Sequence, residues 1–119
     1  MNNYKELKVW KRAVNLSTEV YKITNTFPKS EIYGITSQIN RSVISIAANI
    51  AEGAGRNSNK EFNHFLGISL GSSFELDTLL YIAKNLNYIN DSILKKVSDE
   101  ITEIQKMTRG FQKSLNKSI

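Results

Sequence analysis

The sequence has no cysteine, one proline, one histidine and no long uncharged apolar run, and each scarcity excludes a class of protein. Without cysteine, the chain cannot form disulfides or thiolate metal sites. No segment approaches the roughly 18 consecutive apolar residues of a membrane span. The first twelve residues carry charge where a secretory signal would be apolar, so we expect no export and a cytoplasmic location.

The single proline, Pro28, argues against a turn-rich all-β chain and favours a few long helices. Apolar residues recur in steps of three and four, which is the period of one helix face. This spacing predicts helices at about residues 5–26, 31–52, 59–87 and 91–117. Ser30, Ser58 (or Asn57) and Asn90 stand where N-caps are expected.

The connections between these helices are short, so sequential helices should be antiparallel neighbours. The 119 residues are enough for one buried core and too few for a second independent one. The sequence therefore predicts an all-α, antiparallel up-down-up-down four-helix bundle, with one domain over residues 1–119.

The second and third predicted helices carry more apolar surface than one bundle core can bury. The residues outside their core-facing seams are Ile44, Ala47, Ala48, Ala51, Ile68, Phe74 and Ile82. In a chain this short, the cover expected for such surface is another copy of the chain. The alternative is that these are ordinary scattered surface residues. We predict a homo-oligomer that buries the backs of both helices.

Gly67 and Gly71 lie one helical turn apart in the third predicted helix, among several serines. Each glycine costs about 1 kcal/mol relative to alanine inside a helix, so a packing reason is expected. We therefore expect another backbone to approach closely at this stretch, with the alanines of the second helix as the facing surface.

Three short motifs match chemical signatures without the partners that those signatures need. Residues 67–71 match Gly-x-Ser-x-Gly, but Ser69 lies inside a predicted helix rather than at a strand-to-helix turn. Glu61 and His64 match one Glu-x-x-His of a di-iron bundle, which requires a second histidine. Residues 53–56 precede a helix and could hold a phosphate, although a plain helix cap is the commoner role. We expect no enzyme, no cofactor and no metal.

The net charge of +5 is concentrated in the first and last predicted helices. In an antiparallel bundle, the start of the first and the end of the last lie at one end. The basic residues brought together there are Lys5, Lys8, Lys11, Arg12, Lys106, Arg109, Lys113 and Lys117. RNA or DNA phosphates are the expected partner of such an end. The alternative is a solvated basic face that serves solubility or pairs with an acidic protein.

The second predicted helix also has a polar stripe that runs from Gln38 to Glu52. Arg41 and Glu52 share this flank, which predicts a structural charge pair rather than a catalytic carboxylate. A competing hypothesis for the whole protein is an interaction scaffold whose partner docks on this stripe.

Several blocks of the sequence resemble the four-helix-bundle proteins encoded in intervening sequences of bacterial 23S ribosomal RNA genes. The resemblance spans about residues 7–86 and rests on LKVWKRA, FPKSEIYG, SIAANIAEG and GSSFEL, in that order and spacing. The family motif positions carried over to this chain are Trp10, Pro28, Gly34, Arg41, Asn49, Glu52, Gly53, Arg56, Gly71 and Glu75. Asn40 stands where a second arginine is commoner, which weakens any basic site on the second helix.

That family is similar to the accessory variability protein of diversity-generating retroelements, a basic pentameric barrel that binds nucleic acid and the reverse transcriptase. The resemblance implies the bundle, favours a homopentamer and points to a reverse-transcriptase-like or ribosomal partner. It assigns a structural polar motif to Arg41, Asn49, Glu52, Arg56 and Glu75. We predict a non-enzymatic homopentamer whose basic end contacts RNA or DNA in a ribonucleoprotein or retroelement-type assembly.

Overall fold

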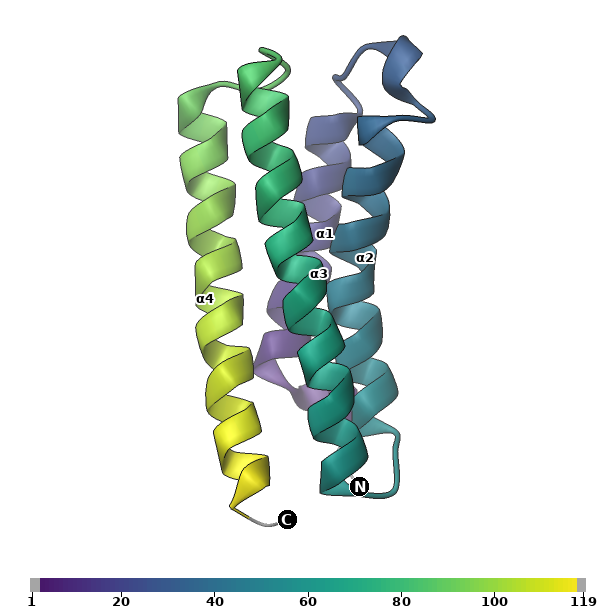
Figure 1. Cartoon of the computed structure of the whole chain (residues 1–119), viewed down its shortest axis with the longest axis vertical. Coiled ribbons are helices and arrows are strands. Elements are labelled where there is room, and N and C mark those ends of the chain that lie inside the picture. Colours follow the sequence, from purple (N-terminus) through teal and green to yellow (C-terminus); the bar gives the residue numbers. More distant parts are fainter. Residues whose placement is uncertain (1–2, 118–119) are drawn as a thin grey trace.

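The computed structural model describes residues 3–117, which form four α-helices and two short 3₁₀ turns (Figure 1). The elements are η1 (Tyr4–Glu6), α1 (Lys8–Thr24), η2 (Lys29–Glu31), α2 (Ile35–Ala54), α3 (Asn59–Asn85) and α4 (Asp91–Asn116). No strand occurs among these residues, so the prediction of an all-α chain with four helices is confirmed. No helix in residues 3–117 is both long enough and apolar enough to cross a membrane.

The four helices lie side by side in a bundle 46 Å long and about half as wide, with extents of 46 × 23 × 20 Å. In Figure 1, the α1–α2 and α3–α4 connections lie at the upper end of the bundle. The α2–α3 connection, the start of α1 and the end of α4 lie at the lower end. Helix α3 packs between α2 and α4. Segments about 100 residues apart in the chain therefore meet at one end.

Two of the three predicted N-caps are present. The Ser58 hydroxyl accepts a hydrogen bond of 3.1 Å from the Glu61 amide at the start of α3. The Asn90 side chain accepts one of 2.8 Å from the Ile93 amide at the start of α4. Each bond satisfies an amide that the helix itself leaves unpaired. These two helices therefore begin close to where the sequence places their starts.

The prediction that Ser30 caps the second helix is wrong, because α2 begins at Ile35 and Ser30 lies in η2. The reason is a tertiary contact with the α3–α4 connection. The Tyr88 hydroxyl donates a 2.8 Å hydrogen bond to Glu31, and its ring centroid lies 5.3 Å from that of Phe27. Residues 27–34 are therefore held against Tyr88 instead of continuing the helix.

Apolar side chains fill the interior along the bundle. The largest buried aliphatic residues are at most 1% exposed: Ile39, Ile46, Ile50, Leu66, Leu76, Leu80, Ile101 and Ile104. Full burial of such a side chain contributes about 1.5–3 kcal/mol relative to exposure. This shared core fixes the arrangement of the helices, and so it positions their exposed basic and apolar surfaces.

Helices α2 and α3 approach closely at Gly53, which the sequence indicated as a family motif position and as part of a helix end, but not as a packing contact. A Cβ there would lie 2.8 Å from the Phe65 Cβ and 2.9 Å from the Phe62 Cδ1, closer than carbon atoms can pack. Within residues 3–117, the close approach of another backbone expected at Gly67 and Gly71 does not occur. A Cβ at Gly71 would meet nothing within 4 Å.

Candidate nucleic-acid interface

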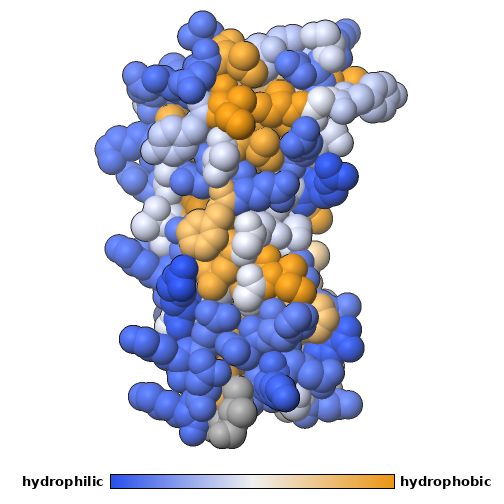
Figure 2. Space-filling view, in the orientation of Figure 1, coloured by the Kyte–Doolittle hydropathy of each residue, from blue (hydrophilic) through white to orange (hydrophobic). Residues whose placement is uncertain are grey.

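The eight predicted basic residues come from segments toward the lower end of Figure 1: η1, the first two turns of α1, and the C-terminal half of α4 with its C-cap Lys117. All except Arg12 are exposed. In Figure 2, the lower part of the visible face is almost uniformly hydrophilic. This end therefore combines exposed cations with a surface that offers little for apolar packing.

Four basic residues in the second half of α4 and at its C-cap form one stripe. Lys106, Arg109, Lys113 and Lys117 follow one another in steps of three, four and four residues, which places them on the same side of the helix. At 1.5 Å rise per residue, the stripe is about 16 Å long. None of the four forms an ion pair with another residue of the described range 3–117. The charges of the stripe are therefore not paired with carboxylates within this range.

Arg12 behaves differently from the other seven, because its charge is already paired. Its Nε and Nη2 atoms donate hydrogen bonds of 2.9 and 2.6 Å to the two carboxylate oxygens of Glu100 in α4. The hydrogen bond to Glu100 raises the pKa of Arg12 and so favours its charged form. Arg12 therefore joins α1 to α4, and those of the eight cations without an ion pair within residues 3–117 are Lys5, Lys8 and Lys11 at the N-terminal end and the four residues of the stripe.

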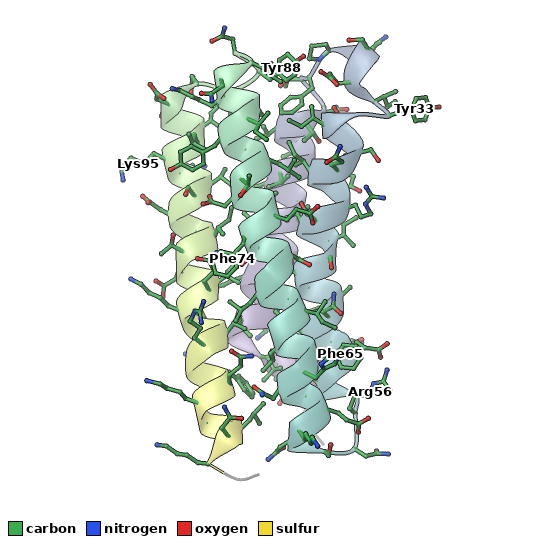
Figure 3. All side chains as sticks on the ribbon, in the orientation of Figure 1. Tyr33, Arg56, Phe65, Phe74, Tyr88 and Lys95 are labelled. Carbon is green, nitrogen blue, oxygen red and sulfur yellow. The ribbon has the colours of Figure 1, made fainter. Side chains whose placement is uncertain are left out.

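Arg109 connects the stripe to α3. Its guanidinium carbon lies 5.8 Å from the centroid of the Phe74 ring, a cation–π distance. Figure 3 shows Phe74 pointing from α3 toward α4, and its side chain is 48% exposed. Phe74, which the sequence assigned to the oligomer interface, therefore lies beside the basic stripe.

Two cations in or near the α2–α3 turn also lie at this end, and sequence reasoning did not include them in the basic group. Arg56 and Lys60 are both exposed. The Arg56 guanidinium carbon lies 4.7 Å from the centroid of the Phe65 ring, and both residues are labelled at the lower right of Figure 3. The bundle topology was the signal that could have found them, because this turn must lie at the same end as the start of α1.

The predicted charge pair between Arg41 and Glu52 is wrong. These residues are eleven positions apart on one helix, about 16 Å along its axis. Glu52 pairs instead with Arg56 one turn later, at 3.6 Å. Arg41 is exposed beside a shallow groove between α1 and α2 that Tyr21 and Ile44 also line. The fifth member of the predicted polar motif, Glu75, is exposed on α3.

Much of the polar stripe on α2 is engaged within the chain. The Asn49 amide donates to the Ser45 carbonyl and hydroxyl at 2.8 and 2.9 Å. The Ser72 hydroxyl of α3 donates to the Ser45 hydroxyl at 2.8 Å. The Ser72–Ser45 bond joins α3 to α2, and the two Asn49 bonds lie within α2. Ser45 and Asn49 are therefore less free to dock a partner than the scaffold hypothesis requires.

The predicted oligomer residues fall on two separate surfaces. Ile44 and Ala48 are exposed and line a shallow groove between α1 and α2, together with Trp10. Ile68 and Ile82 lie on the outer face of α3 and are 41% and 44% exposed. Part of this second surface is visible as orange patches along α3 in Figure 2.

Ala47 and Ala51, which the sequence predicts on an outward-facing surface, are both less exposed than expected. Ala47 is only 8% exposed and packs in the core, so its assignment to an outer face is wrong. Helix α1 packs against this side of α2 and covers Ala47, which still borders the groove lined by Trp10 and Ile44. Ala51 is half-buried.

The three chemical motifs provide no reactive site. Ser69 is 1% exposed and its hydroxyl donates to the Ile46 carbonyl at 2.9 Å, so it is not available as a nucleophile. Within residues 3–117, no cluster of three or more His, Asp and Glu side chains could hold a metal ion. The amides of Gly55 and Arg56 are bonded to carbonyls of α2, and this uses the donors that a phosphate would need.

Comparison with known proteins places these features in a family. The model of the family described as 23S rRNA-intervening sequence protein matches residues 5–110. A solved structure from Bacteroides thetaiotaomicron VPI-5482, described as a protein with unknown function from the S23 ribosomal protein family, has a TM-score of 0.82. It is 24% identical over 88% of this chain and 98% of its own, a likeness that shows the fold alone. Among curated proteins, none matches the chain.

Proposed function

The chain belongs to the 23S rRNA-intervening sequence protein family, and from this premise we propose that it is a non-enzymatic homo-oligomer that binds nucleic acid. The observation that carries the proposal is the stripe of Lys106, Arg109, Lys113 and Lys117, four exposed cations on one side of α4. The proposal takes the helices as an antiparallel bundle in the cytoplasm. Its wider setting is a ribonucleoprotein or retroelement-type assembly with a reverse-transcriptase-like or ribosomal partner.

Unpaired lysine and arginine side chains bind phosphates by displacing condensed counterions. Four such contacts predict a logarithmic salt slope of about −3 to −4, with no dependence on base sequence. Membership of the 23S rRNA-intervening sequence protein family supports an RNA-related role. The charge arrangement supports it physically, because the stripe has no carboxylate partner within residues 3–117.

The self-association part of the proposal rests on the two separate apolar surfaces. An isologous dimer buries the same patch on both subunits, whereas a head-to-tail contact joins two different patches and closes into a ring if the rotation permits. The α1–α2 groove around Ile44 and the outer face of α3 around Ile68 are two different patches. We infer a cyclic oligomer, with five subunits as the proposed number, in which the basic stripe repeats around one end.

The test of nucleic-acid binding compares two variants of equal charge. Replacement of Lys106, Arg109, Lys113 and Lys117 by glutamine lowers the formal net charge from +5 to +1. The matched control replaces Lys22, Lys29, Lys95 and Lys96, in the upper half of Figure 1, by glutamine. Its formal net charge is also +1. Binding of fluorescently labelled RNA is measured by anisotropy at low salt and over a salt series.

We expect the wild type and the control to bind with a steep salt dependence, and the α4 variant to lose binding. The proposal fails if the wild type binds no RNA or DNA at low salt. It also fails if the α4 variant and the control lose affinity equally, because binding would then follow net charge rather than the stripe.

A further inference from the structure

We propose that the nucleic acid held by the α4 stripe is single-stranded, and that one of its bases stacks on the Phe74 ring. This inference rests on the proposed function and narrows its ligand from nucleic acid in general to strands with unpaired bases. The elements that carry it are the exposed ring, the arginine beside the ring and the straight row of cations.

The Phe74 ring is exposed to solvent, although contact with water does not stabilise an apolar phenyl group. Nearly half of the residue is accessible, as are Ile68, Tyr81 and Ile82 elsewhere on α3, but Phe74 is the one of these that lies beside a cation of the stripe. Every base has a flat π-face, so an exposed ring beside a basic groove is a stacking platform for bases of any sequence. The ring therefore offers the base contact that the stripe by itself does not.

Arg109 places a positive charge at the same point. Its guanidinium lies 5.8 Å from the Phe74 centroid and also belongs to the stripe. A guanidinium in this position can bond a phosphate oxygen while it flanks a ring that holds the adjacent base. Arg109 therefore links backbone binding to base stacking within one nucleotide.

The space around the ring allows a flat ligand to reach it. Gly71, three residues before Phe74 on α3, has no side chain, and a Cβ there would meet nothing within 4 Å. Gly110, next to Arg109 on α4, is equally open. These glycines do not bind anything themselves, and neither adds a side chain that could cover the Phe74–Arg109 pair.

The geometry favours a single strand over a duplex. The cations follow one another every 4.5–6 Å or so along a straight helix, which suits the phosphates of one extended strand. In a duplex, each base is already stacked between its neighbours, so a ring on a rigid helix cannot stack on one without unpairing it. A duplex would contact this surface through phosphates only.

The experiment measures dissociation constants for a labelled oligouridine of about 15 nucleotides and for an RNA duplex of the same length, at one salt concentration. Phe74→Leu keeps an apolar side chain and good helix propensity but removes the aromatic face. Tyr81→Leu is the matched control, because Tyr81 is an aromatic residue two turns farther along the same side of α3 and is 52% exposed. A 5-iodouridine oligonucleotide is cross-linked by light, and the attached peptide is identified by mass spectrometry.

We expect the wild type to bind the single strand more tightly than the duplex, and the cross-link to map to the peptide that contains Phe74. Phe74→Leu should weaken single-strand binding roughly five- to hundredfold and leave duplex binding unchanged. Tyr81→Leu should change neither.

Equal weakening of single-strand and duplex binding by Phe74→Leu, or no weakening at all, overturns the inference. A lower oligomer mass for Phe74→Leu also overturns it, because the ring would then be buried between copies. If the wild type binds both nucleic acids equally, the inference fails while the proposed function stands. If it binds neither at low salt, the proposed function fails as well.

Discussion

Arg12 and Glu100 form the one ion pair between α1 and α4 within residues 3–117, through two parallel hydrogen bonds of 2.9 and 2.6 Å. They line a groove of about 790 Å³ between these helices, whose floor includes Leu16 and Val97. The pair therefore joins the two helices on a side where apolar packing leaves space.

A double-mutant cycle at this pair measures its contribution. With Arg12→Gln and Glu100→Gln, we expect a coupling of about 0.5–1 kcal/mol in the free energy of unfolding, because the side chains are 42% and 32% exposed and solvent weakens their attraction. Urea denaturation provides the measurement. The Lys95–Asp99 pair, at 79% and 68% exposure, is the control and should couple more weakly. A zero coupling energy between Arg12 and Glu100 would contradict the inference that their ion pair stabilises the contact between α1 and α4.

Replacement of Gly53 by alanine should destabilise the protein by about 1–3 kcal/mol, despite the better helix propensity of alanine. The reason is the 2.8 Å distance from the new Cβ to the Phe65 Cβ, which no rotation of the phenyl ring can relieve. Gly110→Ala is the matched control, since a Cβ there meets nothing within 4 Å. The control should stabilise the protein by about 0.5–1 kcal/mol. Chemical denaturation of both variants gives the sign of each change in the free energy of unfolding. A more stable Gly53→Ala variant would refute the close approach of α2 and α3 at Gly53.

The Tyr88–Glu31 hydrogen bond should make stability fall at alkaline pH. This bond raises the pKa of Tyr88 above the ordinary value of 10.0, so the folded state holds this proton more tightly than the unfolded chain. The stabilisation is fully present below the unfolded pKa and is lost as pH rises through the folded pKa. We expect Tyr88→Phe to show a smaller decrease in urea midpoint above about pH 10 than the wild type does.

Tyr33→Phe serves as the control for this titration, because Tyr33 is 95% exposed. Its stability profile should follow that of the wild type. An unchanged alkaline decrease in Tyr88→Phe would show that other groups cause it.

Mixing two interface variants distinguishes a ring from a symmetric dimer. Ile44→Glu removes one proposed patch and Ile68→Glu removes the other; both side chains are more than 40% exposed, so folding should survive. Each variant alone should lose the oligomer mass measured by light scattering. An equimolar mixture should form a heterodimer, because one intact contact remains between unlike subunits.

Tyr33→Glu, on an exposed residue outside both patches, should keep the wild-type mass. A monomeric wild type at micromolar concentration would refute self-association altogether. A mixture that shows no heterodimer would exclude the head-to-tail contact between these two patches.

Features that depend on neighbouring residues along the chain followed from the sequence. The four helices come from the three-to-four apolar spacing, and Ser58 and Asn90 cap helices because each side chain bonds an amide three residues later. The α4 stripe is of the same kind, since residues three and four apart on a helix always share a side.

Features that depend on how one helix is rotated against another required the tertiary structure. Ala47 and Ile44 both lie outside the seam expected for the second helix, but α1 covers the first and leaves the second exposed. Arg12 pairs with Glu100, which is 88 residues later in the sequence, and no local spacing predicts this pair. Glu52 pairs with Arg56 rather than Arg41 because an ion pair needs a distance of a few ångströms, and sharing a flank does not provide it.

The sequence by itself determined that this chain forms four helices and carries free positive charge along the last one, because helix formation and charge periodicity are local properties. Only the tertiary structure decided that Phe74 and Arg109 lie together and that Gly53 admits no side chain. Those contacts follow from the packing of side chains in three dimensions, where fractions of a helical turn decide which residues meet.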